Sequence, residues 1–561
     1  MLQSPQVPLK VPYRSGRDIS HPNSLTTQVG TITPLFVQEV IPNTKINLRI
    51  SLAGSLPPLA SDTFMRVEEK VQAFFVPMRL LYGGFEDWFN QNEVGSISRN
   101  GAGTNVQTRS VVSMPYALFT SQFGDSRQTY RRYFGPGTLS DYLGFKNLPQ
   151  PGPEFQGMEL SLLPYLAYHL IWDTWFRAPR IQNSCFAKPA GLVDTDIANA
   201  PAYFVSMLPY ITLTDSGCLR VSPDTSFSSI VMADGKHVLS LRQANFGYDY
   251  FTNALPSPQL GDDARVTVEE DNAFSISALR AMNSLQQFRE RNGLAGVRFI
   301  ETLKSRYGAN LGDAVAQRPV CLGVASYDIY SKSVDVTASN TDSDIYNPFS
   351  ARAGAQLGRA YLSGSDLLID GYTANEPGYI FVVGTLVPKV RYGSGTRRYL
   401  RHYITNGFAS IADMANPILE NVGMQPIYNY EVSDILGDIL DQDTIFGYTD
   451  RYAEFKTYEG EVHGHLRNGE SLQSFVFQRY FSGLNTISTE FLEIPTDSLS
   501  DVFAYQSSID GEELYTYGIW LDMDFDCKIS DVLSDFAIPS LQDPAYEHGE
   551  TIIVHRGGFR F

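Results

Sequence analysis

The stretch LPYLAYHLIWDTWFR, residues 163–177, places large apolar or aromatic side chains on every side of a predicted helix. Pro164 suits the first turn, where the N–H that proline lacks has no partner in any case. A helix that is apolar all round must be covered by protein on both sides, from the same chain or from a neighbouring copy. We therefore predict a layered protein, and we assign the rings of this helix to subunit packing. These rings belong to Tyr165, Tyr168, Trp172, Trp175 and Phe176.

Strict alternation of apolar and polar residues predicts half-buried strands, because successive side chains of a strand point to opposite faces. It occurs at residues 45–52, 65–75 and 519–529. Residues 379–388, YIFVVGTLVP, are apolar on both faces and predict a central strand that is covered on both sides. Helices are predicted at residues 277–291 and 299–307, between strands. This spacing favours a mainly β protein, a sandwich with long loop insertions, in one domain over residues 1–561.

The composition excludes several classes of protein. Of 561 residues, 43% are hydrophobic and 19% are charged, and no linker or repeat divides the chain. No run reaches the roughly 20 apolar residues of a membrane helix, and we find no signal peptide, so we expect no membrane span. The net charge of −18 argues against a protein that coats nucleic acid by itself. The four cysteines lack zinc-ligand spacing and are interpreted as reduced thiols. They are Cys185, Cys218, Cys321 and Cys527.

Several segments resemble one viral family in the same order along the chain. They are the helix at 163–177, DYFTNALPSPQ (249–259), GLAGVRFIETLKSRYG (293–308), QRP (317–319) and FGYTDRYAEFK (446–456). RSGRDISH (14–21), FFVPMRLL (74–81) and GTLSDYLGF (137–145) fit the same pattern. Together they resemble the major capsid protein of the Microviridae, small tailless phages with single-stranded DNA, and in particular the gokushovirus branch.

The resemblance implies an eight-stranded viral jelly roll, an antiparallel β-sandwich with long, partly helical loop insertions. It implies a structural protein, not an enzyme, without a cofactor. Such a chain self-assembles into a T=1 icosahedral shell around a circular single-stranded DNA genome and presents the host-attachment surface. The expected partners are identical copies, the DNA genome, a small basic DNA-associated protein, a minor pilot protein and a bacterial host receptor. The expected location is the virion, after assembly in the host bacterial cytoplasm.

The same resemblance divides the chain into regions. Residues 1–30 are expected to form an extended N-terminal arm, residues 80–310 the inter-strand insertions with helices, and residues 391–515 a second insertion region. Only residues 260–276 stand where gokushoviruses carry a long insertion that forms a threefold spike. Residues 182–247 are longer than expected and are the candidate exposed variable insertion. The C-terminal tail, residues 531–561, ends in HRGGFRF and has no family counterpart.

The densest basic patch is RYGSGTRRYLRHY, residues 391–403, in which arginines interleave with tyrosines and no acid intervenes. Guanidinium groups pair with phosphates and tyrosine rings stack on bases, so the patch is a candidate contact for single-stranded DNA. The predicted contacts are Arg391, Arg397, Arg398, Arg401, Tyr399 and Tyr403. The alternative is an interface in which acidic neighbours pair with these arginines.

The proline-rich N-terminal arm is the second candidate for DNA contact, through Lys10, Arg14 and Arg17. Prolines keep such a segment extended. The alternative is that the arm straps onto a neighbouring subunit, and one arm can do both.

Two groups of residues are candidate metal ligands by residue type. Asp522, Asp524 and Asp526 share one face of a predicted strand, but residues two apart on a strand lie roughly 6–7 Å from each other, too far for one ion to bind all three. His463 and His465 share a predicted strand face without a third ligand nearby. We therefore expect solvated strand faces and no metal at either place.

Other motifs give no basis for catalysis. Residues 431–443, EVSDILGDILDQD, are interpreted as a solvated helix followed by a loop, since the EF-hand ligand pattern is missing. Phosphate-loop, G-x-S-x-G and H-E-x-x-H motifs are absent from the sequence. The competing interpretation is a β-sandwich carbohydrate-binding protein or glycoside hydrolase, because a jelly roll rich in aromatic residues allows it. Closed particles of uniform size would fit only the shell.

Overall fold

The computed structural model describes the greater part of the chain. It covers residues 15–55, 66–82, 85, 93–99, 105–111, 116–119, 134–145, 158–186, 218–221, 232, 234, 236–258, 318–335, 356–400, 424–434, 444–496 and 519–531. The helices predicted at 277–291 and 299–307 and the tail beyond residue 531 lie outside these ranges.

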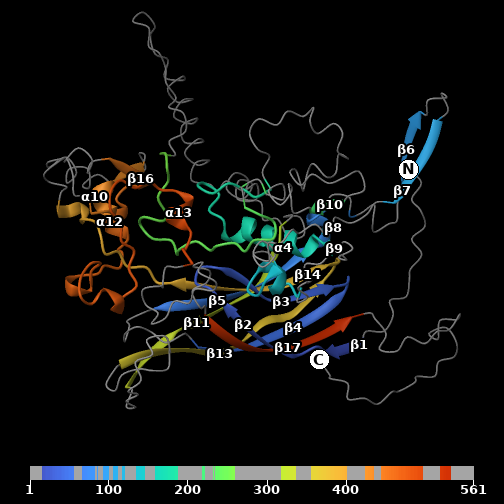
Figure 1. Cartoon of the computed structure of the whole chain (residues 1–561), viewed down its shortest axis with the longest axis horizontal. Coiled ribbons are helices and arrows are strands. Elements are labelled where there is room, and N and C mark those ends of the chain that lie inside the picture. The colour runs from blue at the N-terminus through green and yellow to red at the C-terminus, as the bar shows by residue number, and fades with distance from the viewer. Residues whose placement is uncertain are drawn as a thin grey trace, which may run out of the picture.

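Two antiparallel sheets face each other and form the body of the molecule (Figure 1). The six-stranded sheet has the order β1 (Ser15–Asp18), β17 (Ile519–Asp531), β4 (Thr44–Ser55), β13 (Gln356–Ala374) and β12 (Tyr330–Asp335), with β2 (His21–Thr27) also paired to β17. The four-stranded sheet has the order β11 (Val320–Asp328), β5 (Val67–Pro77), β14 (Gly378–Pro388) and β3 (Ile32–Val40).

This arrangement confirms the predicted fold class, a mainly β sandwich of the jelly-roll type with long, partly helical insertions. The predicted number of eight strands is not confirmed, because the two sheets hold six and four strands among the described residues. The predicted strands at 45–52, 65–75, 379–388 and 519–529 correspond to β4, β5, β14 and β17.

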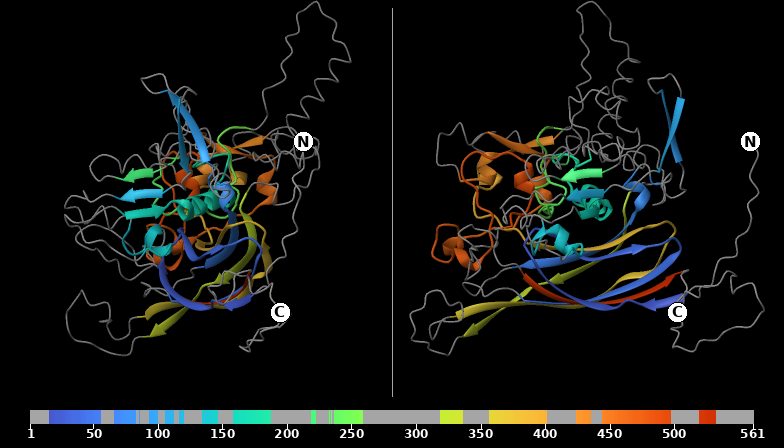
Figure 2. Two further views of the ribbon diagram at one scale, coloured as in Figure 1. Left: turned by 90° about the vertical axis from the view of Figure 1, so that its right-hand side faces the viewer. Right: turned by 45° about the vertical axis from the view of Figure 1, so that its right-hand side comes forward.

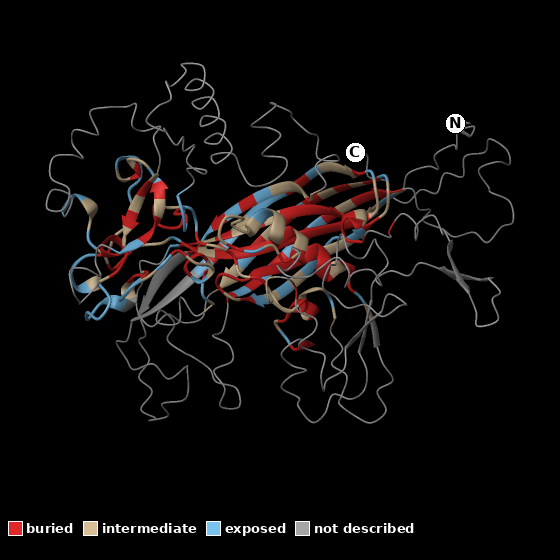
Figure 3. Cartoon of the chain, turned by 90° about the horizontal axis from the view of Figure 1, so that it is seen from above, coloured by how far each residue is buried: buried red, intermediate tan, exposed pale blue. Residues whose placement is uncertain are grey.

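The predicted alternation is also confirmed, because one face of β4 and of β17 fills the space between the sheets (Figure 3). The inward side chains are those of Ile46, Leu48, Ile50, Leu52, Leu521, Met523, Phe525 and Cys527, and all of them are buried. Burial of each such side chain stabilises the fold by about 1.5–3 kcal/mol before chain entropy is subtracted. The sandwich is therefore held together mainly by these apolar faces.

The four-stranded sheet needs a second cover, since β14 is buried on both faces. The cover is α4 (Leu163–Ile171), which has a proline in its first turn and continues as a π-helical turn, η2 (Trp172–Phe176) (Figure 1). Trp175 and Phe176 contact the ring of Phe74 on β5 at 5.6 and 6.3 Å between centroids. The predicted helix is thus present, but its last turn is π-helical and ends at Phe176.

The rings assigned to subunit packing are packed within the chain itself. Tyr165, Tyr168 and Trp172 are at most 4% exposed, and the Tyr168 hydroxyl donates a hydrogen bond to the Ile32 carbonyl at 2.7 Å. Trp175 retains 39% exposure. The sequence left open whether the same chain or a neighbouring copy covers this helix. The cover comes from the same chain.

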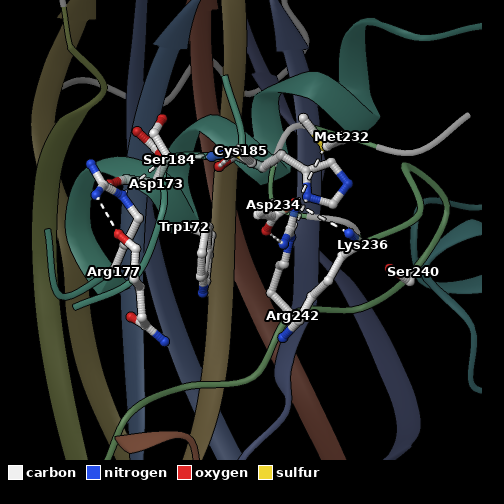
Figure 4. Close-up of polar contacts among 12 residues, drawn as sticks. Trp172, Asp173, Arg177, Ser184, Cys185, Met232, Asp234, Lys236, Ser240 and Arg242 are labelled. Atoms are coloured by element: carbon white, nitrogen blue, oxygen red, sulfur yellow. Dashed lines mark hydrogen bonds and ion pairs between the residues drawn. The ribbon is translucent and has the colours of Figure 1, made fainter. Parts of the chain in front are cut away.

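A buried polar cluster fastens the segment after residue 232 to α4 (Figure 4). Arg242 is fully buried, forms an ion pair with Asp234 and stacks over the Trp172 ring at 4.5 Å. Its Nε donates to Nδ1 of His169 at 2.8 Å, and burial holds the pKa of His169 well below its usual value. His169 is therefore neutral and donates from Nε2 to the Val238 carbonyl at 2.6 Å. Part of the segment 182–247, predicted to be exposed, thus lies in the core.

A second hydrophobic cluster stands beside the sandwich, and we call residues 250–255, 390–400, 424–434 and 444–496 the satellite module (Figures 1 and 2). It contains β15 (Met424–Tyr428), α10 (Asn429–Val432), β16 (Ile445–Asp450), α12 (Ala453–Lys456), η6 (Gly464–Leu466), η7 (Gln473–Phe475) and α13 (Thr489–Leu492). Its core includes Phe251, Tyr392, Ile427, Phe446 and Phe491. The module therefore has a small core of its own, formed mainly by the predicted second insertion region and completed by residues 250–255.

Smaller elements lie between β5 and β11. They are η1 (Met78–Leu80), β6 (Glu93–Arg99), β7 (Asn105–Val111), β8 (Tyr116–Phe119), α3 (Leu139–Tyr142), β9 (Met158–Ser161) and β10 (Cys218–Val221). β6 pairs with β7, and β8 lies between β9 and β10. Residues 15–27 form β1 and β2 on the edge of the six-stranded sheet, so this part of the predicted N-terminal arm is built into the sandwich.

Glu69 is a carboxyl group on the inward face of β5. It is 1% exposed, and neither of its oxygens has a hydrogen-bond partner among the described residues. Burial raises the pKa of Glu69 to about 8. Gly384 on β14 leaves room for it, because a Cβ at that position would lie 2.5 Å from Oε1 of Glu69. The carboxyl therefore enters the core in its neutral form.

Replacement of Glu69 with Gln should change how stability depends on pH. Between about pH 4.5 and pH 8 the unfolded chain loses this proton while the folded chain keeps it, so the free energy of unfolding falls by about 1.4 kcal/mol per pH unit. Glu69→Gln removes this loss, and its advantage over the unsubstituted chain should grow from pH 5 to pH 8. Urea midpoints of the unassembled chain measure it. Glu68→Gln on the opposite face of β5 is the control, and an advantage independent of pH would contradict the assignment.

Replacement of Arg242 with Leu should destabilise the cover of the four-stranded sheet. Asp234 would remain largely buried without its cation, which costs about 3–5 kcal/mol. Thermal unfolding and limited proteolysis between residues 186 and 250 measure the effect. Lys389→Ala is the matched control, because its ion pair with Asp328 is 53% and 54% exposed and contributes about 0–1 kcal/mol. Equal shifts in the two variants would show that Arg242 has no special role.

Candidate functional site

The predicted basic patch lies at a cavity of about 220 Å³ in the satellite module. Residues 392–399 form one wall, and α10, α12 and the segment 459–463 supply the others. The glycines of the patch let the backbone pass close to its neighbours: Gly395 has a left-handed φ of +88° and a Cβ there would lie 2.2 Å from the Glu431 carbonyl oxygen. The turn GSG therefore brings the two following arginines into the cavity.

Arg397 lies between acidic and aromatic side chains. Its Nε contacts a carboxylate oxygen of Glu461, and its Nη1 is 4.0 Å from Glu459. Its guanidinium also stacks over the Tyr458 ring at 3.8 Å. The side chain is 21% exposed, so one guanidinium is shared by two carboxylates near the mouth of the cavity.

Arg398 is more deeply buried, with 10% of its side chain exposed. It donates from Nη1 to the Pro426 carbonyl at 2.8 Å and to Glu431 at 3.4 Å, and its Nε is 3.8 Å from Glu454. Glu431 also accepts from the Tyr250 hydroxyl at 3.0 Å. Burial raises the pKa of Glu431 to about 7, although Arg398 acts in the opposite direction. The prediction of a solvated helix from residue 431 is therefore wrong at Glu431, which is buried in α10.

Arg397 and Arg398 are thus paired with acids, as the alternative interpretation expects for the patch, and these acids belong to the same chain. Arg391 is half-buried beside Gly460, and Arg401 and Tyr403 lie outside the described residues. Tyr399 is 64% exposed. DNA contact at this patch stays a prediction, and the two central guanidinium groups are already engaged.

Three exposed aromatic rings surround the cavity. Tyr399 and Phe455 line it, Tyr458 stacks on Arg397, and they are 64%, 65% and 82% exposed. We call these three residues the aromatic rim. Only Tyr399 was among the predicted site residues. Phe455 and Tyr458 lie in the segment YAEFKTYEGE, where three aromatic residues are interspersed with three acidic ones, and that composition is the signal that could have found them.

The N-terminal candidates are separated by the structure. Arg17 lies on β1 and forms an ion pair with Asp531 at the end of β17, at 2.9 Å. Lys10 and Arg14 lie outside the described residues. Arg17 therefore joins two strands of the sandwich.

The metal candidates have other partners. Asp522, Asp524 and Asp526 are exposed on β17, as predicted, and Asp522 accepts from the Ser24 hydroxyl at 2.6 Å. His463 and His465 lie at η6, so the predicted strand is wrong, and Nε2 of His463 is 3.2 Å from Glu461 while Nδ1 of His465 is 3.3 Å from Glu470. In the described part of the chain, no three His, Cys, Asp or Glu side chains form a group that could hold a metal ion.

Two further expectations concern cysteines and membranes. Cys185, Cys321 and Cys527 are free thiols, and burial raises the pKa of each of them, that of Cys527 to about 12. Among the described helices, none is long and apolar enough to span a bilayer.

Comparison with known proteins assigns the family. The family model "Capsid protein (F protein)" matches residues 5–517. Capsid protein VP1 of Chlamydia phage 1 is 25% identical, over 88% of this chain and 91% of the relative. Capsid protein VP1 of Bdellovibrio phage phiMH2K is also 25% identical, over 88% of this chain and 90% of the relative, and that of Spiroplasma virus 4 is 23% identical over the same shares. The chain therefore belongs to the F-protein family of phage capsid proteins, and it is a structural component of a virion, not an enzyme.

Proposed function

We propose that this capsid protein assembles into a T=1 icosahedral shell that encloses a circular single-stranded DNA genome and presents the host-attachment surface. The observation that carries the proposal is the satellite module with its aromatic rim, because large exposed rings are typical of protein interfaces. The module stands on one side of the sandwich (Figure 1), so one subunit offers two unlike surfaces. Contacts between unlike surfaces generate closed rings of subunits when the rotation between successive copies closes.

The net charge of the chain supports a packaging scheme in which a second protein neutralises most of the phosphates of the genome. A net charge of −18 cannot neutralise phosphates, and the two central arginines of the basic patch are paired with glutamates. We therefore propose that a small basic DNA-associated protein supplies most of the positive charge. Local DNA contacts would come from Lys10, Arg14, Arg391, Arg401 and Tyr403. A minor pilot protein completes the particle, which assembles in the host bacterial cytoplasm.

Host attachment is assigned to the part of residues 182–247 that does not pack in the core. Residues 236–246 and Gln182 are held against α4 and α13 by buried contacts, so both ends of the insertion are anchored. A bacterial receptor would meet the residues between these ends. Such an arrangement, a variable segment on a fixed base, is common for binding surfaces.

The purified chain, expressed with its basic partner, should form closed particles of uniform size. Sedimentation velocity and negative-stain microscopy measure the size, and nuclease-resistant single-stranded DNA should accompany the particles. A chain that remains monomeric in the presence of its basic partner and DNA would contradict the shell. Open tubes or particles of several sizes would contradict the T=1 arrangement alone.

Replacement of Arg398 with Ala separates a structural role from DNA contact. Glu431 and Glu454 would lose their shared cation, and an unpaired buried carboxylate costs about 3–5 kcal/mol, so we expect far fewer particles with normal DNA content. Arg397→Ala should have a smaller effect of the same kind. Particle yield and the ratio of absorbance at 260 and 280 nm measure both quantities.

The control is Arg467→Ala, whose ion pair with Asp434 at the same cavity is 46% and 30% exposed. It should leave particle yield unchanged. A normal yield of Arg398→Ala particles that contain little DNA would instead support the DNA contact.

A further inference from the structure

The cavity of the satellite module is lined by more carboxyl groups than arginines that pair with them. Among the described residues, four glutamates line it, at positions 431, 454, 459 and 461, and they share the two arginines Arg397 and Arg398, while His463 also contacts Glu461. Arg467 also lines the cavity, but its charge is countered by Asp434. Burial raises the pKa of Glu459, because its charged form is poorly compensated, and a further cation beside it would stabilise that form. The cavity therefore favours a ligand that brings a further cation.

The aromatic rim suits the same kind of ligand. Tyr458 already stacks on the guanidinium of Arg397, which shows that this geometry is available at the mouth of the cavity. Tyr399 and Phe455 expose their rings beside it. Arginine flanked by aromatic residues would pair with the glutamates and stack on the rim at the same time.

The chain itself contains such a sequence. Residues 551–561, TIIVHRGGFRF, include Arg556 and Arg560, two phenylalanines and no acid. In a chain with a net charge of −18, an acid-free stretch of this composition is chemically complementary to the cavity.

The route of the chain favours a contact between two copies. Asp531, the last described residue, is the register partner of Ser15, so β17 ends beside β1. α10 and α12 lie on the opposite side of the sandwich from β1, as two views agree (Figures 1 and 2). At about 3.3–3.6 Å per residue, residues 532–561 can reach on the order of 100 Å, enough to meet an adjacent subunit.

We propose that the segment 555–561 of one copy docks into the satellite cavity of a neighbouring copy, with an arginine among the four glutamates and phenylalanines on the aromatic rim. This inference rests on the proposed assembly into a shell, and it names one of the contacts that closes it. The contact joins unlike surfaces of successive copies, so it propagates around a ring of subunits.

Chemical cross-linking of two introduced cysteines tests the contact. Lys456→Cys places a thiol at the exposed end of α12, and Gly558→Cys places one between the two arginines, so the glutamates, the arginines and the rim remain intact. A short bifunctional thiol reagent added to particles of this double variant should give a ladder of covalently joined chains. The native Cys185 and Cys527 are buried and should contribute little, and any background from Cys218 and the half-buried Cys321 is the same in the control variant.

The matched control combines Gly558→Cys with Tyr361→Cys, a residue 48% exposed on β13 of the sandwich. It should give at least tenfold less cross-linked product. Cross-linking only within one chain would overturn docking onto a neighbour. Particles that give no cross-link between positions 456 and 558 would overturn the docking proposal but not the proposed shell. Failure of the unsubstituted chain to form particles would reject the proposed shell itself.

If the double variant does not form particles, a binding measurement tests whether the segment docks into the cavity. A fluorescent peptide of residues 551–561 should bind the full chain. Its affinity should fall at least tenfold when both arginines of the peptide are replaced with Gln. The same loss is expected for a chain with Glu459→Gln and Glu461→Gln, but not with the exposed Glu470→Gln. Absence of binding, or equal binding by all three chains, would overturn the proposal.

Discussion

The outer face of the four-stranded sheet is the constraint on which the rest of the molecule depends. β14 has no polar face to turn toward water, so the sheet is stable only with a second layer over it. The chain between β5 and β11 supplies that layer, since α4 and η2 pack on Phe74 and the buried Arg242 cluster fixes the following segment in place. A long insertion that could be taken for surface decoration is therefore in part a structural requirement of the sandwich.

Local patterns in the sequence predicted the parts of this fold whose cause is local. Alternation along residues 45–52 and 519–529 predicts a strand with one buried and one solvated face, and β4 and β17 have that burial pattern. The unbroken apolar run at 379–388 predicted a strand covered on both sides, and the all-round apolar helix predicted a layer able to cover it. Each of these predictions follows from where consecutive side chains must point, which requires no knowledge of distant residues.

The cavity of the satellite module depends on contacts between residues far apart in the sequence, which no local pattern predicts. The glutamates that engage Arg397 and Arg398 come from positions 33 to 64 residues further along the chain, so the patch looked unpaired in the sequence. The histidines at 463 and 465 obey the strand alternation but lie at a short 3-10 turn. Glu69 is different, because its place on the inward side of β5 follows from alternation alone. A carboxyl at an inward position is a local signal of a group held neutral.

The position of β17 has a consequence for biosynthesis. This strand lies inside the six-stranded sheet, between β4 and the short strands β1 and β2, although it is the last described strand in the chain. The N-terminal strands have no place to pair until the ribosome has passed residue 531, and β4 keeps an open edge until then. A nascent or truncated polypeptide therefore lacks the finished surface of the sandwich. Translation products that end before β17 therefore cannot complete the six-stranded sheet.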